Sequence, residues 1–309
     1  FGPKRLIIQA FRGVGKSWIT SAFVVWKLLC DPQLKFLVIS ASKQRSDDFS
    51  TFTKRIIQEM PVLQHLRARE DQRNSNVAFD VAPSRASHAP SVKSVGITGQ
   101  IVGSRAHVII ADDVEVLSNA LTQIMRDKLG EVVKEFDAVV MPKVGRIVYL
   151  GTPQVEESLY SNLQSRGYEC RIWPARMPES RLKTFYGTKL APYIDKLSLT
   201  VGDPTDPQRF DDLDLTEREA SYGKSGFALQ FMLDTSGEDD QRYPLKLADL
   251  IVIPLSTESG PGQILYGKDD LLDIPAVGLT GDYFYKVMKV SEDYFTYTGS
   301  AMHIDPSGR

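Results

Sequence analysis

Cysteine is scarce in this sequence of 309 residues, where only Cys30 and Cys170 occur. They lie far apart and form no C-x-x-C pair, which argues against a disulfide framework or a zinc site and suits a reducing compartment. The sequence also lacks an apolar run long enough to span a membrane, and no signal peptide precedes its first apolar segment. We therefore expect a soluble, cytoplasmic protein with no membrane partner.

An excess of charge of one sign is missing as well. The formal net charge is −2, with 42% hydrophobic and 25% charged residues. These fractions are typical of a globular chain and argue against wholesale disorder or a coiled coil. No global positive field is present, so contact with a nucleic acid would need a local patch or loop. Composition alone does not identify a partner.

Histidines at metal-ligand spacing are also missing. The sequence has four histidines, none of which is paired in this way, and we interpret them as structural. They are His65, His88, His107 and His303. The three tryptophans, Trp18, Trp26 and Trp173, stand in apolar contexts, and the first two are eight residues apart on one face of a predicted helix. This pattern predicts that they belong to the core.

Strands and helices alternate along the first half of the chain. Apolar runs predict strands at residues 4–10, 35–41, 92–98, 107–111 and 146–150. Helical periodicity predicts helices at residues 16–29, 44–60 and near 117–136. Strands that alternate with helices imply an α/β fold with a parallel sheet, flanked by helices and joined by right-handed crossovers.

The second half has a different character. Residues 201–220 are rich in acids and contain two prolines, which predicts a solvated lid or linker. From Tyr243 onward the predicted strands are short, with alternating runs at 283–290 and 294–304. We expect a core at 1–200, a lid or linker at 201–242 and a β-rich part at 243–309. The chain starts without methionine and stops just after an apolar run, so we expect a piece of a longer protein.

A phosphate-binding loop stands between the first predicted strand and helix. It reads Ala10-Phe11-Arg12-Gly13-Val14-Gly15-Lys16-Ser17 and matches G-x-x-x-x-G-K-[ST] except that Ala10 replaces the first glycine. Gly13 and Gly15 allow backbone N–H groups to turn toward phosphate, at the positive end of the helix. Lys16 would neutralise the β- and γ-phosphates and Ser17 would bind Mg²⁺. The sequence therefore predicts a P-loop nucleotidase that uses ATP and Mg²⁺.

A pair of acids follows the strand predicted at 107–111. Asp112 and Asp113 would lie at the carboxyl end of a buried parallel strand, where ligands bind in such sheets, and Glu115 follows closely. Asp112 fits the acid that holds Mg²⁺ through water, and either Asp113 or Glu115 fits the acid that polarises the attacking water. An acidic pair after a strand can also be a helix N-cap.

The sequence does not decide the roles of three residues that precede the acidic strand. Gly99 and Gly103 suit a backbone that bends sharply. Arg105 either reaches phosphate or pairs with an acid on the surface, and the pattern does not decide between these roles.

Four segments together resemble the large terminase subunits of tailed phages, most closely those of T7-like phages. They read A-F-R-G-V-G-K-S, G-Q-I-V-G-S-R, V-I-I-A-D-D-V-E and Y-L-G-T-P-Q within residues 4–154, with a weaker match at 227–232. The resemblance implies a P-loop fold of the ASCE type that hydrolyses ATP and drives double-stranded DNA through the portal into a prohead. It also implies a portal protein and a small terminase subunit as partners and a homo-oligomeric ring, a pentamer in the family. The protein would then work in the host cytoplasm and transiently at the portal vertex.

The resemblance assigns roles to single residues. Arg12 would lie near the γ-phosphate as a sensing or charge-stabilising group, although it could also face solvent. The sequence allows a cis or a trans mechanism, and we favour cis for Arg12, with an unidentified second arginine acting in trans. Asp113 would be the catalytic carboxylate directly after Asp112, but the family usually has Glu there, so Glu115 stays an alternative. Thr152, with Gln154, would belong to the motif that couples hydrolysis to movement.

The last residues resemble the first strand of an RNase H-like nuclease domain. In residues 302–308, Asp305 would be the first metal-binding and catalytic carboxylate of that domain. One carboxylate cannot hold two catalytic metals, so endonuclease activity is expected only of a longer parent chain. The same residues also fit a plain Asp-Pro turn.

Other functions share these motifs. A helicase-like DNA translocase would use the same loop and acids, but it normally has a second ATPase-like domain, which nothing after residue 201 repeats. A small-molecule phosphotransferase would need an acceptor pocket, which the sequence does not reveal. A nucleotide-dependent switch would bind nucleotide without steady turnover, and the acids after the strand favour turnover over a switch.

Overall fold

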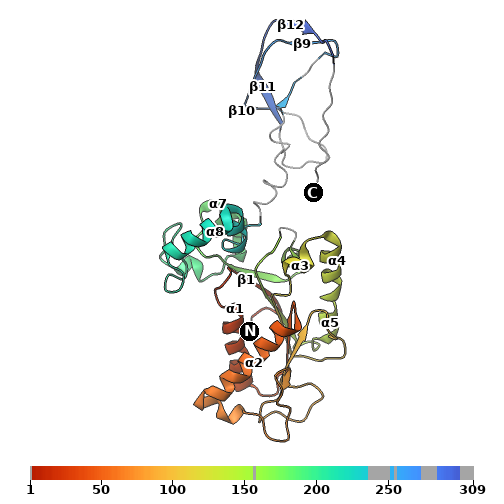
Figure 1. Cartoon of the computed structure of the whole chain (residues 1–309), viewed down its shortest axis with the longest axis vertical. Helices are drawn as coiled ribbons and strands as arrows, with labels where there is room; N and C mark the ends of the chain where they lie inside the picture. Colours follow the sequence, from red (N-terminus) through yellow and green to blue (C-terminus); the bar gives the residue numbers. More distant parts are fainter. Residues whose placement is uncertain (1, 156–157, 236–250, 254–255, 273–283, 300–309) are drawn as a thin grey trace. The chain divides into compact units, whose positions relative to one another are not determined.

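The computed structural model describes residues 2–155, 158–235, 251–253, 256–272 and 284–299. The chain divides into two compact units, Phe1–Glu238 and Asp239–Arg309 (Figure 1). The first unit carries all the predicted site residues except Asp305. The finer boundaries near residues 200 and 242 stay predictions.

The first unit is built on a sheet of seven strands. Their spatial order is β3 (Ala78–Phe79), β4 (Val92–Gly96), β2 (Phe36–Ser40), β5 (Val108–Asp112), β6 (Arg146–Gly151), β1 (Arg5–Ala10) and β7 (Glu169–Trp173). All neighbours pair in parallel except β3 with β4. The five predicted strands are confirmed. One strand, β6, separates the phosphate-loop strand β1 from the acidic strand β5, as in the predicted ASCE-type P-loop fold.

Helices cover both faces of this sheet. The described helices of the first unit are α1 (Lys16–Cys30), α2 (Lys43–Glu59), α3 (Leu117–Ala120), α4 (Gln123–Val132), α5 (Glu135–Val139), α6 (Leu159–Ser165), α7 (Ser180–Tyr186) and α8 (Asp212–Gln230), with 3-10 turns at η1 (Pro61–Leu66), η2 (Gly187–Lys189) and η3 (Ile194–Lys196). The helix predicted near 117–136 is broken into α3, α4 and α5, and the Thr122 hydroxyl starts α4 by accepting from the Met125 amide. Within the described residues, no helix has the length and apolar character that crossing a membrane requires.

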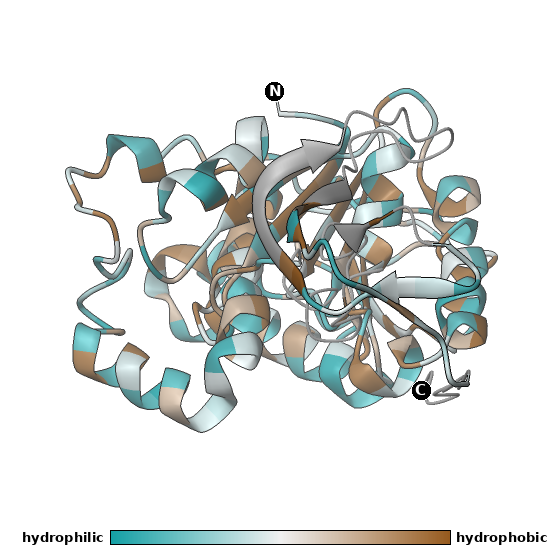
Figure 2. Ribbon diagram, turned by 90° about the horizontal axis from the view of Figure 1, so that it is seen from above, coloured by the Kyte–Doolittle hydropathy of each residue, from teal (hydrophilic) through white to brown (hydrophobic). Residues whose placement is uncertain are grey.

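The core consists of two main layers, one on each face of the sheet. Leu37, Ile39 and Ile109 pack with α4, α5, α6 and α7, whereas Phe36 and Val38 pack with α1 and α2. Successive side chains of a strand point to opposite faces, so strands covered on both sides are apolar throughout. In Figure 2 the helices are banded with teal and brown, as expected of amphipathic helices.

The prediction for two of the tryptophans is wrong. Trp18 and Trp26 are 69% and 55% exposed, because α1 turns Val24, Val25 and Leu28 toward the sheet and these two rings lie on the opposite side. The eight-residue spacing correctly placed them on one face, but periodicity does not say which face is inward. Trp173 is half-buried and packs against the core, in line with the prediction.

The acid-rich segment packs on the phosphate loop. Its acids are exposed or half-buried, but Phe210 and Leu215 are buried in a small cluster with Phe11, Phe227 and Phe231. Phe11 and Phe210 meet edge to face with ring centroids 5.0 Å apart. The expectation of a solvated linker therefore fails for these apolar residues, which attach α8 to the loop.

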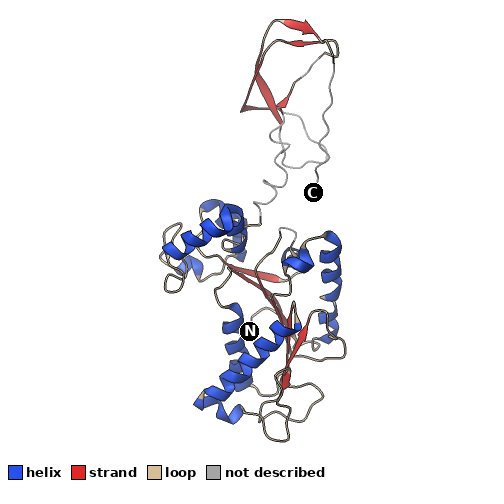
Figure 3. Cartoon of the chain, in the orientation of Figure 1, coloured by secondary structure: helices blue, strands red, loops and turns tan. Residues whose placement is uncertain are grey.

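The described part of the second unit is made of strands, as predicted (Figure 3). β8 (Ile251–Val252), β10 (Ile264–Leu272) and β11 (Phe284–Val290) form one sheet, and β9 (Ser259–Pro261) pairs with β12 (Tyr294–Thr296). Asp305 and His303 lie outside the described residues, so the nuclease strand at 302–308 stays a prediction.

Candidate active site

The phosphate loop joins β1 to α1. Gly13 and Gly15 have φ angles of 90° and 89°, which residues that carry a side chain rarely adopt. A Cβ atom on Gly13 would also lie 3.2 Å from the Phe210 ring. Ala10 is the last residue of β1 and has no positive φ angle, so glycine is not required there. The departure from the motif is therefore compatible with the loop.

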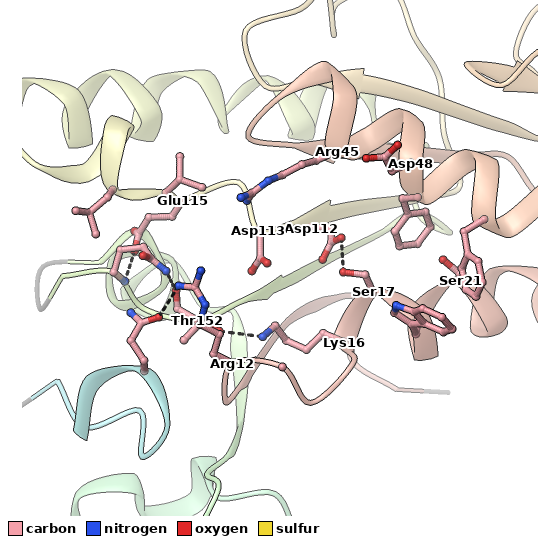
Figure 4. Close-up of a pocket in the computed structure, with 18 residues that line it drawn as sticks. Arg12, Lys16, Ser17, Ser21, Arg45, Asp48, Asp112, Asp113, Glu115 and Thr152 are labelled. Carbon is pink, nitrogen blue, oxygen red and sulfur yellow. Dashed lines mark hydrogen bonds between the residues drawn. The ribbon is translucent and has the colours of Figure 1, made fainter. Parts of the chain in front are cut away.

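Lys16 connects the phosphate loop to β6. Its Nζ donates to the Ala10 carbonyl at 3.0 Å and to the Thr152 hydroxyl at 2.9 Å (Figure 4). Thr152 is buried and donates in turn to the Ala10 carbonyl at 3.0 Å. Burial lowers the pKa of Lys16, while the charges of Asp113 and Asp112 raise it. The lysine predicted to bind phosphate is thus bonded to the residue predicted to couple hydrolysis to movement.

Ser17 and Asp112 meet at the start of α1. The Ser17 hydroxyl donates to Asp112 Oδ2 at 2.7 Å. Asp112 Oδ1 is buried and has no hydrogen-bond partner among the described residues. An orphaned buried oxygen of this kind is one that a water or a cation would satisfy. In proteins Mg²⁺ keeps several waters and takes its other ligands from a few protein oxygens and from substrate phosphates. The Ser17 hydroxyl and the Asp112 carboxylate could supply those protein oxygens.

Asp113 turns its side chain into the pocket. Its φ angle of 46° lies in the left-handed region, and its amide donates to the Leu150 carbonyl at 2.9 Å. The half-buried carboxylate faces the space beside Lys16, and no hydrogen bond joins it to another described residue (Figure 4). Strained backbone of this kind gathers at functional sites. Asp113 is therefore placed to accept a bond from a water.

Glu115 is engaged elsewhere. Its side chain is buried and accepts from the Gln154 amide at 3.0 Å, the Ser158 hydroxyl at 3.0 Å and the Leu159 amide at 2.5 Å. Burial raises its pKa, and the bonds from these three residues lower it. Glu115 thus borders the pocket but fastens the chain that follows β6.

Arg12 and Gln230 link the phosphate loop to α8. The Gln230 backbone carbonyl accepts from the Arg12 amide at 3.1 Å, and its side-chain oxygen accepts from Arg12 Nη1 at 3.3 Å. The Gln230 amide nitrogen donates to the Pro153 carbonyl at 2.9 Å. One side chain at the end of α8 therefore contacts both the phosphate loop and the chain after β6.

These residues surround one pocket of about 660 Å³. Among the predicted residues it brings together Arg12, Gly13, Lys16, Ser17, Asp112, Asp113, Glu115, Thr152 and Gln154. A convergence of perturbed acids, a half-buried lysine and an open cavity is typical of an active site. The strand order explains it, because β1, β5 and β6 end at the same edge of the sheet.

No protein-family model matches the chain. The large terminase subunit of Enterobacteria phage T3 is 49% identical over an alignment of 317 residues, which covers 99% of this chain and 54% of that protein. The chain belongs to the large terminase family. It spans about half the length of the relative it matches.

Solved structures are more distant from this terminase chain. The large terminase of a thermophilic bacteriophage, solved in complex with ADP, is 11% identical, with a TM-score of 0.46 over 87% of this chain and 58% of that one. The ATPase domain of the Thermus phage P74-26 large terminase is 12% identical, with a TM-score of 0.44 over 76% and 90% of the two chains. The fold assignment therefore rests on the strand order and the phosphate loop.

Arg105 of the terminase chain does not reach the active site. It lines a different and smaller pocket with His88 and Lys93, and its guanidinium donates to the Ser104 carbonyl at 2.8 Å. Of the two roles that the sequence left open for Arg105, contact with phosphate in the active-site pocket does not fit its position. Its position follows from the turn before β5, which lies at the opposite end of that strand from the acids.

Sequence reasoning also missed part of the terminase site. Arg45, Asp48 and Phe49 of α2 line the same pocket as the acids. The signal that could have found them is the rule that ligands bind at the carboxyl ends of parallel strands, because α2 starts just past the end of β2. To apply that rule one must know that β2 lies beside β5, and the sequence does not show this pairing.

Burial sets the protonation of Asp112 in the terminase chain. It raises the pKa of this carboxyl to about 6, helped by the charge of Asp113 and opposed by the bond from Ser17 and the charges of Lys16 and Arg45. The folded chain therefore holds this proton more tightly than the unfolded chain, and the stability of the parent protein falls as pH rises from about 4 to about 6.

Replacing Asp112 with asparagine should stabilise the metal-free protein at pH 8 by up to about 3 kcal/mol, since asparagine does not titrate. The advantage should shrink to nearly nothing below about pH 4, where the aspartate is neutral in both states. Urea unfolding at a series of pH values, without Mg²⁺, measures it. Asp195→Asn, at an exposed position, is the control. A D112N protein no more stable than the parent at pH 8 contradicts the prediction.

Proposed function

We propose that this chain is the ATP-hydrolysing motor of a large terminase and that it moves double-stranded DNA into a prohead. The observation that carries the proposal is the joint placement of Lys16, Ser17, Asp112, Asp113 and Thr152 around one pocket. The first four are the groups that phosphoryl transfer from a nucleotide requires, and Thr152 links Lys16 to the end of β6. The identity of 49% to a large terminase subunit supports the link to packaging.

Each residue has a role in the proposed reaction. The amides of residues 13–17 bind the phosphates of ATP, and Lys16 neutralises the β- and γ-phosphates. Ser17 and Asp112 would hold Mg²⁺, which supplies charge neutralisation at those phosphates when bound. Asp113 orients a water for attack on the γ-phosphorus and accepts its proton while the bond to the ADP oxygen breaks.

Arg12 stabilises charge on the transferred group within its own chain. It lines the pocket from the phosphate loop, and Gln230 holds its guanidinium only by a bond of 3.3 Å. A cation added at the γ-phosphate is a usual device of these enzymes, whether the same chain or a neighbour supplies it. An additional arginine from a neighbouring subunit is compatible with this assignment.

Coupling runs through Thr152 in the proposed motor. The bond from Lys16 Nζ to the Thr152 hydroxyl competes with the bonds that Lys16 would make to phosphate. Nucleotide binding would therefore withdraw a donor from Thr152, and hydrolysis with phosphate release would return it. Since Glu115 and Gln230 fasten the residues just after Thr152, the change would pass to α6 and α8.

The wider assignments follow from the family. We propose double-stranded DNA, a portal protein and a small terminase subunit as partners, and a homo-oligomeric ring, a pentamer in the family, docked on the portal. The site of action would be the host cytoplasm and, transiently, the portal vertex. Endonuclease activity is assigned only to a longer parent chain, with Asp305 as one of its metal ligands.

The decisive experiment measures phosphate release from ATP with Mg²⁺, alone and with added DNA. We expect turnover that linear double-stranded DNA raises several-fold, while single-stranded DNA of equal nucleotide concentration does not. A K16A protein controls for contaminating ATPases. Preferential stimulation by single strands would favour a helicase-like translocase, and tight nucleotide binding without turnover would favour a switch. Either outcome would contradict the packaging motor.

A further inference from the structure

The geometry points to Arg45 as a further catalytic residue, one that contacts the terminal phosphoryl group of the nucleotide bound by its own chain. The inference rests on the proposed function, because it assigns a ligand to the γ-phosphate end of the same pocket. No sequence motif marks this arginine. Its position depends on the pairing of strands that are distant along the chain.

The first observation is that the start of α2 is fixed beside the acids. β2 pairs with β5, and Ser40 at its end lies opposite Asp112. The Ser42 hydroxyl caps α2 by accepting from the Arg45 amide at 3.3 Å. A Cβ atom on Gly96 of β4 would lie 2.8 Å from the Lys43 amide nitrogen, so the sheet backs closely onto the first turn of the helix. Arg45 therefore projects from a well-supported position.

The second observation is the direction and partnership of the side chain. In Figure 4 the Arg45 guanidinium points from α2 into the pocket toward Asp113. The other cations of α2 have partners outside the pocket: Lys43 pairs with Asp47, Arg55 pairs with Glu59, and Lys54 donates to the Asn74 carbonyl at 2.7 Å. Arg45 has no ion pair with any described residue, although four carboxylates line the same pocket, those of Asp48, Asp112, Asp113 and Glu115. Its guanidinium donors thus remain available to a ligand.

The third observation is the distribution of charge around the pocket. Lys16 and Arg12 come from the phosphate loop on one side, and Arg45 comes from α2 on the other, with Asp112 and Asp113 between them. During transfer the negative charge spreads over three oxygens of the γ-phosphoryl group. A planar fork of donors matches such oxygens better than a point charge does. Arg45 is placed to bind those on the side of the attacking water.

The test compares three variants of the chain with the parent. R45A should lower the kcat of Mg²⁺-dependent ATP hydrolysis about a hundredfold, the loss expected for one preorganised donor. R45K should keep part of the rate, because charge remains without the fork. R55A removes an exposed arginine of the same helix, paired outside the pocket, and should behave as the parent. R45A at the parental rate overturns the inference.

Binding measurements separate contact with phosphate from an effect through Asp113. Affinity for ADP alone should stay within about threefold in R45A, while affinity for ADP with aluminium fluoride, which mimics the transferred group, should fall about a hundredfold. The same fall should appear when R45A is added to a D113N protein. If it disappears there, Arg45 acts only by positioning Asp113, and the assignment as a catalytic residue fails.

Mixed subunits test whether Arg45 serves its own chain. R45A and K16A proteins should gain no hydrolysis when mixed, because each chain lacks one group of its own site. Recovery of hydrolysis in the mixture would show that the Arg45 of one chain completes the site of another, and would overturn the assignment in cis. A parent chain that binds ATP and Mg²⁺ but never hydrolyses ATP would instead refute the proposed function, and this inference with it.

Discussion

Replacing Lys16 with alanine should lower ATP hydrolysis by about a thousandfold or more, equivalent to at least about 4 kcal/mol of transition-state stabilisation. The physical reason is the loss of the one ammonium group that the phosphate loop delivers to the β- and γ-phosphates. Phosphate release at saturating ATP and Mg²⁺ measures the effect. Hydrolysis within a few-fold of the parent would show that the loop is not the site of catalysis.

Two controls make this result interpretable. K27A removes a lysine from the last turn of the same helix, where it stacks over Trp26 instead of lining the pocket, and should hydrolyse ATP normally. The folded state should survive K16A, because Thr152 still donates to the Ala10 carbonyl and a desolvated charge has been removed. Urea unfolding of both variants checks that the loss of rate is not a loss of fold.

Asp113→Asn should leave nucleotide binding within about threefold of the parent and lower hydrolysis about a thousandfold, within the range expected for a lost general base. Asparagine is the right substitution because it tolerates the left-handed φ of 46°, whereas alanine would strain the backbone there. A fluorescent ATP analogue reports binding, and single-turnover phosphate release reports chemistry. Normal hydrolysis by this variant would remove Asp113 from the mechanism.

Glu115→Gln should produce the opposite pattern. The substitution replaces one carboxylate oxygen with an NH₂ group, which would face the backbone N–H of Leu159 or Gln154, itself a donor. That backbone donor would lose its acceptor at a cost of about 1–3 kcal/mol. Stability should fall, and the chemical step should change much less than in D113N. A folded E115Q protein that binds ATP without hydrolysing it, beside an active D113N protein, would make Glu115 the catalytic acid.

Local patterns predicted the sheet well. The strands around Ile7, Val38 and Ile110 are continuous apolar runs because both of their faces are covered, and such runs are visible in sequence. The phosphate loop was equally visible, since Gly13, Gly15 and Lys16 act within a single turn of chain. These features depend on residues that are close together along the chain.

Features set by distant contacts were not predictable. Trp18 is exposed because of where the sheet lies relative to α1. Periodicity shows which residues share a face of a helix, but not which face is buried. The fastening role of Glu115 depends on Ser158 and Leu159, whose positions follow from the turn after β6. Arg45 came into the site only because β2 pairs with β5. Arg105 went to another pocket because its turn precedes β5 instead of following it.

The side chain of Gln230 has one acceptor and one donor group, and both are used. The acceptor is bonded to Arg12 in the phosphate loop and the donor to Pro153 after β6, at 3.3 and 2.9 Å. A rigid amide can keep both bonds only while the two loops stay in register, so any displacement of one relative to the other must break a bond or carry the end of α8 along. The end of α8 would then keep both bonds when the two loops shift together and it moves with them, and would lose one bond when the loops move apart.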